Sequence, residues 1–198
     1  ILTGVFKGFS GSVELAGRAL KDFGERSLYK KVNLVFQNPE NQIFCDTVGE
    51  EILFAPENMG AGAAGMSEKL KFYSESLGLS DLLKAEPQHL SFGQKKRLAL
   101  ASVMIIEPEV LMLDEPSSNL DYKSRLKLIE TLNGYKKAKI IVTQDIHLAL
   151  SVSGRLIYLE NGILTYDGGF DPERLREKCP CLHEEIIDFK NMTASRNL

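Results

Sequence analysis

The 198-residue chain contains no apolar run approaching the ~18 residues that a transmembrane helix needs. Its first residues show no signal-peptide pattern, and its three cysteines, few and odd in number, indicate a reducing cytosol. Long Lys/Arg runs are also absent and the formal net charge is −3, which argues against a nucleic-acid-binding surface. No segment matches G-x-x-x-x-G-K-S/T, a loop that holds nucleotide phosphates. The composition that remains, 43% hydrophobic and 26% charged residues, indicates one ordinary globular domain or a little more.

Two consecutive carboxylates end the most apolar short run of the chain. The run Val110–Leu113 predicts a strand of a parallel sheet that is buried on both faces. Asp114 and Glu115 follow it, and ligands of open α/β sheets bind at the carboxyl ends of the strands. An Asp in this place is suited to hold Mg²⁺, and a second carboxylate can orient or deprotonate a water molecule. The alternative is a strand that ends at a polar loop with two incidental acids.

An unusual turn precedes this strand. Ser91, Gly93 and Gln94 open a helix that we expect to run over Phe92–Ile105. The free N–H groups and the dipole at such a helix start form an anion-binding site. The following Lys95–Arg97 are expected to complement a nucleotide that faces them or to be solvated, rather than to bind nucleic acid.

These segments together resemble the ATP-binding cassette (ABC) ATPase domain. Leu90–Gln94 resembles its signature sequence, with Phe92 where the family usually has Gly. Leu111–Glu115 resembles the Walker B motif with its catalytic glutamate, and Ser118–Asp121 resembles the D-loop. The motifs are specific in this order and spacing, and the resemblance covers residues 1 to 170. It implies an α/β fold, a P-loop NTPase (RecA-like) parallel-sheet core with an inserted helical subdomain at about 46–105 and with the N-terminal part missing. A charged helical tail is expected over 171–198.

The start of the chain is similar to a later part of that domain. Ile1–Gly4 resembles the Leu-x-Gly segment that closes the helix after the phosphate-binding loop. We therefore expect the chain to begin just after its own Walker A motif, as a fragment or through natural loss. The fragment is favoured because Gly11–Leu15 follows as it would in an intact domain. Without the backbone cradle and its Lys, the chain is expected to bind ATP poorly or not at all.

The resemblance assigns roles to individual residues. Glu115 and Gln144 would be catalytic, and Gln37, at the end of a strand predicted over 31–36, would contact Mg²⁺ and the γ-phosphate. The residues expected to hold Mg²⁺ are Asp114 and Gln37, and those expected to contact ATP are Gln37, Ser91, Gly93, Gln94 and Asp121. Gln144 stands where the family usually has His. His147 cannot replace it, because three residues advance a helix by about 4.5 Å.

The segment from Gln37 to Gly60 narrows the resemblance to the energy-coupling-factor and cobalt-type importer ATPases. Its apolar residues, Phe44 above all, are expected to line a groove for a transmembrane transporter subunit, although some of them would pack inside the helical subdomain. The resemblance implies a second ABC ATPase subunit, in a homo- or heterodimer, at the cytoplasmic face of the cell membrane. The short interval from Gln37 to Ser91 leaves no room for the long coiled coil of DNA-repair relatives, so no nucleic-acid partner is expected.

Other patterns predict where helices, strands and turns of the domain begin and end. Gly60–Gly65 matches G-x-G-x-x-G without a preceding strand, so we interpret it as a linker rather than a dinucleotide site. Ser67 is expected to cap a helix ending before Gly78, and Lys139–Thr143 to form a buried strand. We also expect Asp121 to cap a helix ended by Gly134, Asn161-Gly162 to turn a hairpin, and Cys179-Pro180-Cys181 with His183 to form a loop before a terminal helix rather than a metal site.

Three hypotheses about the function remain open. The leading hypothesis is the ATP-hydrolysing subunit of an importer for a vitamin or a metal ion. The alternative is a non-hydrolysing regulatory half of an asymmetric dimer, which Gln144 and the missing Walker A favour and the intact Asp114 and Glu115 oppose. A third hypothesis, a soluble nucleic-acid ATPase, is supported only by Lys95–Arg97.

Overall fold

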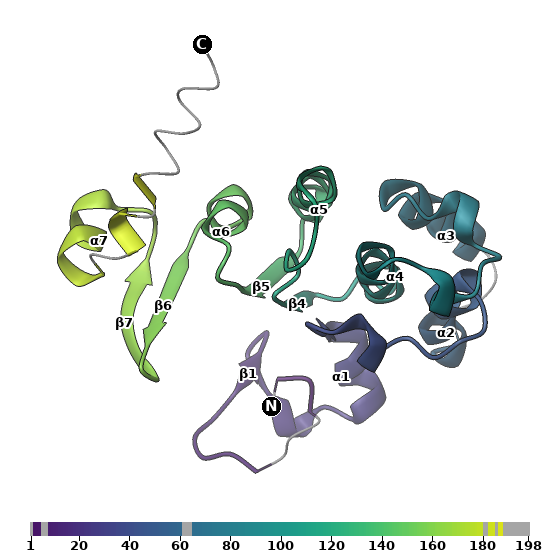
Figure 1. Ribbon diagram of the computed structural model, residues 1–198. Helices are drawn as coiled ribbons and strands as arrows, with labels where there is room; N and C mark the ends of the chain where they lie inside the picture. Colours follow the sequence, from purple (N-terminus) through teal and green to yellow (C-terminus); the bar gives the residue numbers. More distant parts are fainter. Residues whose placement is uncertain (1, 5–7, 61–64, 180–181, 185, 188–198) are drawn as a thin grey trace. The chain divides into compact units, whose positions relative to one another are not determined.

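The computed structural model describes residues 2–4, 8–60, 65–179, 182–184 and 186–187. The chain forms two compact units, Ile1–Val142 and Thr143–Leu198 (Figure 1). The first contains β1 (Glu14–Leu15), β2 (Arg18–Ala19), α1 (Glu25–Lys31), β3 (Val32–Val35), α2 (Val48–Asn58), α3 (Met66–Ser76), α4 (Phe92–Met104), β4 (Val110–Asp114), α5 (Tyr122–Gly134) and β5 (Ala138–Val142). Its 3₁₀ turns are η1 (Leu20–Asp22), η2 (Pro39–Asn41), η3 (Ser80–Leu82) and η4 (Pro87–His89). The second contains α6 (Ile146–Val152), β6 (Leu156–Glu160), β7 (Ile163–Gly168) and α7 (Pro172–Lys178).

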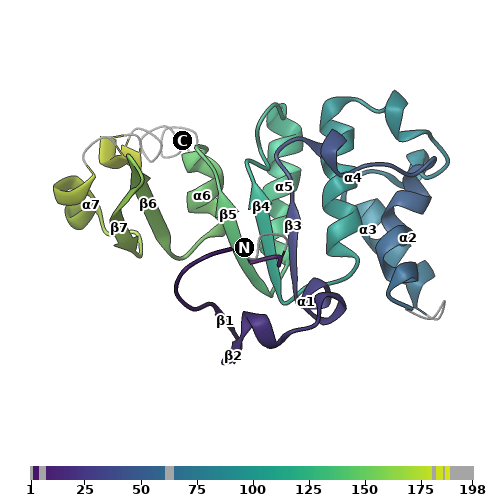
Figure 2. The ribbon, with the colours of Figure 1, turned by 90° about the horizontal axis from the view of Figure 1, so that it is seen from below.

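A parallel sheet lies at the centre of the first unit. Its strand order is β3-β4-β5, and β4 is paired on both sides (Figure 2). Leu111 and Leu113 of β4 are 0% and 1% exposed, which confirms the predicted buried strand. The register places Asp114 opposite Val142 of β5, so β4 and β5 end together at the edge where ligands of such sheets bind.

The prediction of a buried strand after α5 was wrong in one respect. β5 forms close to the expected place, but Ile140 and Val142 are 45% and 61% exposed. β5 is the last strand of this sheet in the described residues, and its side chains alternate between the two faces. An apolar strand is buried on both faces only where both faces are covered, and the face of β5 that carries Ile140 and Val142 is exposed.

α4 packs against β3 of the sheet, and two further helices, α2 and α3, pack against α4. α2 packs against both α3 and α4, and Val48, Ile52 and Leu98 are fully buried there (Figure 1). The prediction that Ser67 caps α3 was wrong. The helix begins at Met66, two residues before the start that a cap at Ser67 would give, and its cap position is Gly65, whose φ of +85° is accessible to glycine. Of the predicted 60–65 linker, 61–64 lie outside the described residues.

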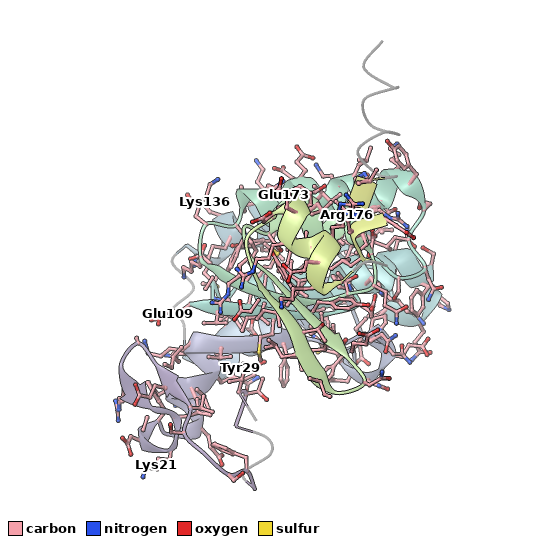
Figure 3. The ribbon with its side chains drawn as sticks, turned by 90° about the vertical axis from the view of Figure 1, so that its left-hand side faces the viewer. Lys21, Tyr29, Glu109, Lys136, Glu173 and Arg176 are labelled. Atoms are coloured by element: carbon pink, nitrogen blue, oxygen red, sulfur yellow. The ribbon has the colours of Figure 1, made fainter. Side chains whose placement is uncertain are left out.

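The second unit is a hairpin packed with helices. β6 and β7 are antiparallel, and Asn161 and Gly162 have the positive φ values, 51° and 78°, that a tight hairpin turn requires. Leu175 of α7 is fully buried in a core with Tyr166, whereas Glu173 and Arg176 lie on the exposed side of the same helix (Figure 3). None of the helices in the described ranges is long and apolar enough to cross a membrane.

The cysteine-rich segment contributes to that core. Cys179 is 4% exposed and packs in the same cluster as Leu175. Cys181, the other cysteine of the Cys-Pro-Cys pattern, lies outside the described residues. Within the described part of the chain, no group of three or more His, Cys, Asp or Glu side chains is placed to hold a metal ion.

Candidate active site

Asp114 and Glu115 lie at the end of β4, and both are half-buried. Glu115 has a φ of +44°, in the left-handed region, where a residue with a side chain is strained by about 1–3 kcal/mol. Its N–H donates to the carbonyl oxygen of Val142, at 2.8 Å, at the end of β5. Strained backbone of this kind is found at sites where a side chain must point in one direction, and here the side chain is the predicted catalytic carboxylate.

Lys96 binds the backbone carbonyl group of Glu115. Its ammonium nitrogen, from α4, donates to the carbonyl oxygen of Glu115 at 2.6 Å and to the hydroxyl oxygen of Ser118 at 2.6 Å. The residue is only 7% exposed, and burial lowers the pKa of its amine, against the opposing attraction of Glu115 and Asp114. The prediction that this lysine faces a nucleotide or is solvated was therefore wrong.

The two neighbours of Lys96 bind other elements. Lys95 forms an ion pair with Glu40 of η2, at 2.8 Å, and Arg97 donates to the hydroxyl oxygen of Ser124 on α5, at 3.3 Å. Successive residues of a helix point about 100° apart, so three consecutive side chains reach three different neighbours. The start of α4 is thus connected to the segment after β3, to the loop after β4 and to α5.

The predicted anion site at the start of α4 has a complete capping box. The hydroxyl oxygen of Ser91 accepts from the N–H of Gln94 at 3.3 Å, and the side-chain oxygen of Gln94 accepts from the N–H of Ser91 at 2.8 Å. Ser91 itself is exposed, and Gly93 lies against Leu120 of the predicted D-loop, where an added Cβ would meet its side chain at 3.5 Å. The structure thus brings the signature segment beside the D-loop, while contacts of Ser91, Gly93 and Gln94 with ATP remain predictions.

Asp121 begins α5 as predicted. One carboxylate oxygen accepts from the N–H of Ser124 at 2.9 Å and the other from its hydroxyl at 2.8 Å. These hydrogen bonds lower the pKa of Asp121. Its carboxylate therefore stabilises the start of α5. That Asp121 contacts a nucleotide stays a prediction.

Gln37 is exposed, two residues beyond the end of β3. A second glutamine nearby, Gln42, was missed by sequence reasoning. Its side-chain oxygen accepts from the N–H of Phe36 at 3.3 Å, and its amide donates to the carbonyl oxygen of Ala99 at 3.2 Å and to Ser102 at 3.4 Å. Gln42 thereby links α4 to the loop that contains Gln37. No pattern in the sequence distinguishes it from a surface glutamine.

Glu51 was also missed. It is 3% exposed, and one of its oxygens accepts from the N–H groups of Phe44 and Cys45, both at 2.9 Å. The ring of Phe44, 64% exposed, stacks edge-on against Phe54 with the centroids 4.6 Å apart. A carboxylate between the apolar residues Val48 and Ile52 is the signal that could have identified Glu51 as the anchor of this loop.

Gln144 belongs to the second unit, where it is exposed and follows β5 by two residues. Next to it, Asp145 caps α6 by accepting from the N–H of Leu148 at 3.1 Å. His147 lies inside α6, with a ring nitrogen 3.5 Å from the hydroxyl of Ser151. The role of Gln144 in catalysis stays a prediction.

Comparison with known proteins identifies the class to which this fold and site belong. Residues 1–118 match the ABC transporter family. A putative ABC transporter ATP-binding protein of Streptomyces avermitilis is 36% identical over 167 residues, which are 84% of this chain and 64% of the relative. The energy-coupling factor transporter ATP-binding protein EcfA1 of Mycoplasmopsis pulmonis is 37% identical over 162 residues, 80% of this chain and 61% of the relative. The chain therefore spans less than two thirds of the length of either protein.

Solved structures agree with this assignment. CbiO1 of Clostridium perfringens, described as part of the ABC transporter complex cbiONQ, superposes with a TM-score of 0.72 at 25% identity, covering 93% of this chain and 79% of that one. The chain belongs to the ABC transporter family of ATP-binding proteins. The predicted α/β P-loop NTPase fold and the predicted family are both confirmed.

Proposed function

We propose that this sequence forms the hydrolytic part of the ATP-binding subunit of an energy-coupling-factor-type importer for a vitamin or a metal ion. The observation that carries the proposal is the placement of Asp114 and Glu115 at the end of the central strand, with the backbone of Glu115 held on both sides. The similarity of this chain to EcfA1 and CbiO1 supports the importer type. ATP hydrolysis that depends on Mg²⁺ and on Glu115 is the test, and it is argued in the Discussion.

The residues present fit a Mg²⁺ site. A carboxylate and an amide oxygen, as in Asp114 and Gln37, are ligands that Mg²⁺ prefers, and it usually keeps several waters besides. Bound there, the ion would offset the negative charge of the phosphates. Glu115 would accept a hydrogen bond from the attacking water and orient it in line with the γ-phosphorus. The ordered backbone of Glu115 supports this role, because the alignment of the water depends on where that carboxylate points.

The signature segment would act on a different nucleotide. In the proposed dimer, Ser91 and Gly93 of one subunit face the γ-phosphate held by the other through N–H groups at the start of α4. Ser91 is exposed and Gly93 half-buried at this helix start, which is consistent with a surface that is completed by a second subunit. Asp121 and the D-loop would lie at the same dimer surface. The site is thus incomplete in one chain, and we place it at the cytoplasmic face of the membrane.

The proposed contact with the transmembrane subunit is made by Phe44 and Phe54. Changing Phe44 to Glu should abolish association with a transmembrane subunit of energy-coupling-factor type in a detergent pull-down. The fold should be retained, because Phe44 is exposed and only its N–H is bonded to Glu51. Phe72→Glu is the matched control, since Phe72 of α3 is 62% exposed. If Phe44→Glu bound as well as the wild type, the docking surface would lie elsewhere.

The regulatory alternative rests on Gln144. A histidine can donate to the γ-phosphate from a rigid ring and take up a proton, whereas the glutamine amide is neutral and less rigid. Losing one preorganised donor typically costs ~10²–10³ in rate, part of which glutamine would recover. In the chain extended upstream by a Walker A segment, Gln144→His is therefore expected to raise single-site turnover at least about tenfold with little change in ATP affinity.

The control for this change is Gln88→His, at an exposed glutamine of η4. A faster Gln144→His variant would show that Gln144 limits the rate at this site and would support an asymmetric dimer. Equal rates would show that Gln144 is an adequate substitute for histidine or that hydrolysis does not depend on this position.

A further inference from the structure

Lys96 is a buried charged residue to which the reaction as described assigns no task. It is 7% exposed, and its ammonium group donates to a carbonyl oxygen and a hydroxyl oxygen. Burying an ammonium group is unfavourable unless its donors are satisfied. A methionine or leucine of similar volume would pack on this side of α4 without that desolvation. The amine therefore calls for a specific explanation.

The carbonyl oxygen of Glu115 is the centre of a small network. It accepts from Lys96 at 2.6 Å, from the hydroxyl of Ser118 at 3.0 Å and from the N–H of Ser118 at 3.2 Å. Lys96 also donates to that same hydroxyl, so it holds both ends of the turn between Glu115 and Ser118. With the N–H of Glu115 bound to Val142, both polar groups of its peptide backbone are fixed.

The same amine contacts the signature segment. Its nitrogen lies 5.7 Å from the ring centroid of Phe92, a distance at which an ammonium group and an aromatic face attract. Phe92 is one turn before Lys96 on α4 and occupies the signature position where glycine is usual. One side chain thus touches the signature segment, the backbone of the catalytic glutamate and the start of the D-loop.

We propose that Lys96 is a positioning residue for ATP hydrolysis, which holds the left-handed turn at Glu115 so that its carboxylate points at the attacking water, and which ties this turn to the signature segment. This inference rests on the proposed function. Lys96 touches neither nucleotide nor water in this role and acts only through Glu115 and Ser118. Loss of its amine should leave ATP binding intact and slow the chemical step.

The first test uses kinetics. In the chain extended by a Walker A segment, Lys96→Met keeps the length of the stem and removes the donor. We expect its kcat for MgATP to fall by about 10- to 100-fold, since small displacements of a catalytic group have effects of that size, with KM changed less than about twofold. Lys96→Arg, which retains a charged donor, should recover most of the rate. Lys127→Met is the matched control, because the amine of Lys127 pairs with Glu130 on the surface of α5 and has no other bond among the described residues.

The second test needs no hydrolysis and uses the full chain as it stands. Hydrogen–deuterium exchange of the backbone should become faster at Ser117–Leu120 in Lys96→Met and stay unchanged over α2 and the rest of α4. Faster exchange throughout α4 would mean that Lys96 merely supports the helix, and would overturn the proposal. An unchanged kcat in Lys96→Met, or a rate of Lys96→Arg no better than that of Lys96→Met, would also overturn it. If the wild type never hydrolyses ATP, the proposed function fails. The exchange of Lys96→Met compared with that of the wild type would still show whether Lys96 holds this loop.

Discussion

Replacing Glu115 with glutamine is expected to lower ATP turnover by about 10²- to 10⁴-fold, the range typical of losing a general base. Glutamine keeps the size of the side chain and loses the charge that orients and deprotonates water. ATP affinity should stay nearly unchanged, because the change removes no proposed contact with the phosphates. Turnover by phosphate release and affinity by equilibrium binding, both in the chain extended by a Walker A segment, measure the two effects separately.

Glu109→Gln is the matched control for this change. Glu109 stands directly before β4, at the opposite end from Glu115, and pairs with Lys31 on the surface. The Glu109→Gln variant should keep the wild-type rate of ATP turnover. Turnover of Glu115→Gln within a few-fold of the wild type would contradict the catalytic assignment of Glu115.

Replacing Ser91 with arginine should abolish the ability of this chain to stimulate a partner subunit that has an intact Walker A motif. Ser91 is exposed and caps α4, and losing a serine cap typically costs about 1 kcal/mol of helix stability. The larger effect is steric, because a long side chain would fill the space where the γ-phosphate of the partner's nucleotide must approach the N–H groups of α4.

The measurement is ATPase activity of the partner with increasing amounts of this chain. Ser67→Arg is the control, since Ser67 is exposed in the first turn of α3 and outside the proposed dimer surface. Stimulation that survived in Ser91→Arg would show that the signature segment of this chain does not complete the partner's site.

The parts of the fold that the sequence predicts are those encoded by local patterns. The buried strand β4 follows from an apolar run, and the starts of α4 and α5 follow from Ser91 and Asp121, whose capping hydrogen bonds span three residues. The turn at Asn161 is local as well. The prediction from Ser67 failed because the cap position of α3 is Gly65, which adopts a left-handed backbone conformation.

The parts that could not be predicted depend on contacts between distant segments. Lys96 and Glu115 are 19 residues apart, and nothing in the spacing shows that a lysine in a basic triplet turns inward to a carbonyl group. The exposure of Ile140 depends on what covers β5, which its apolar sequence does not encode. Glu51 lies between these two cases, because its apolar neighbours Val48 and Ile52 are visible in the sequence, whereas its partners, the N–H groups of Phe44 and Cys45, are not.

The central claim is that this chain carries a working hydrolytic carboxylate and is not an inactive regulatory half. It is tested most directly by single-turnover ATP hydrolysis in the chain extended by a Walker A segment, with and without Mg²⁺. The expected result is slow hydrolysis that requires Mg²⁺, disappears in Glu115→Gln and becomes faster in Gln144→His. ATP that is bound with Mg²⁺ but is not hydrolysed, either by the wild type or by Gln144→His, would contradict the claim.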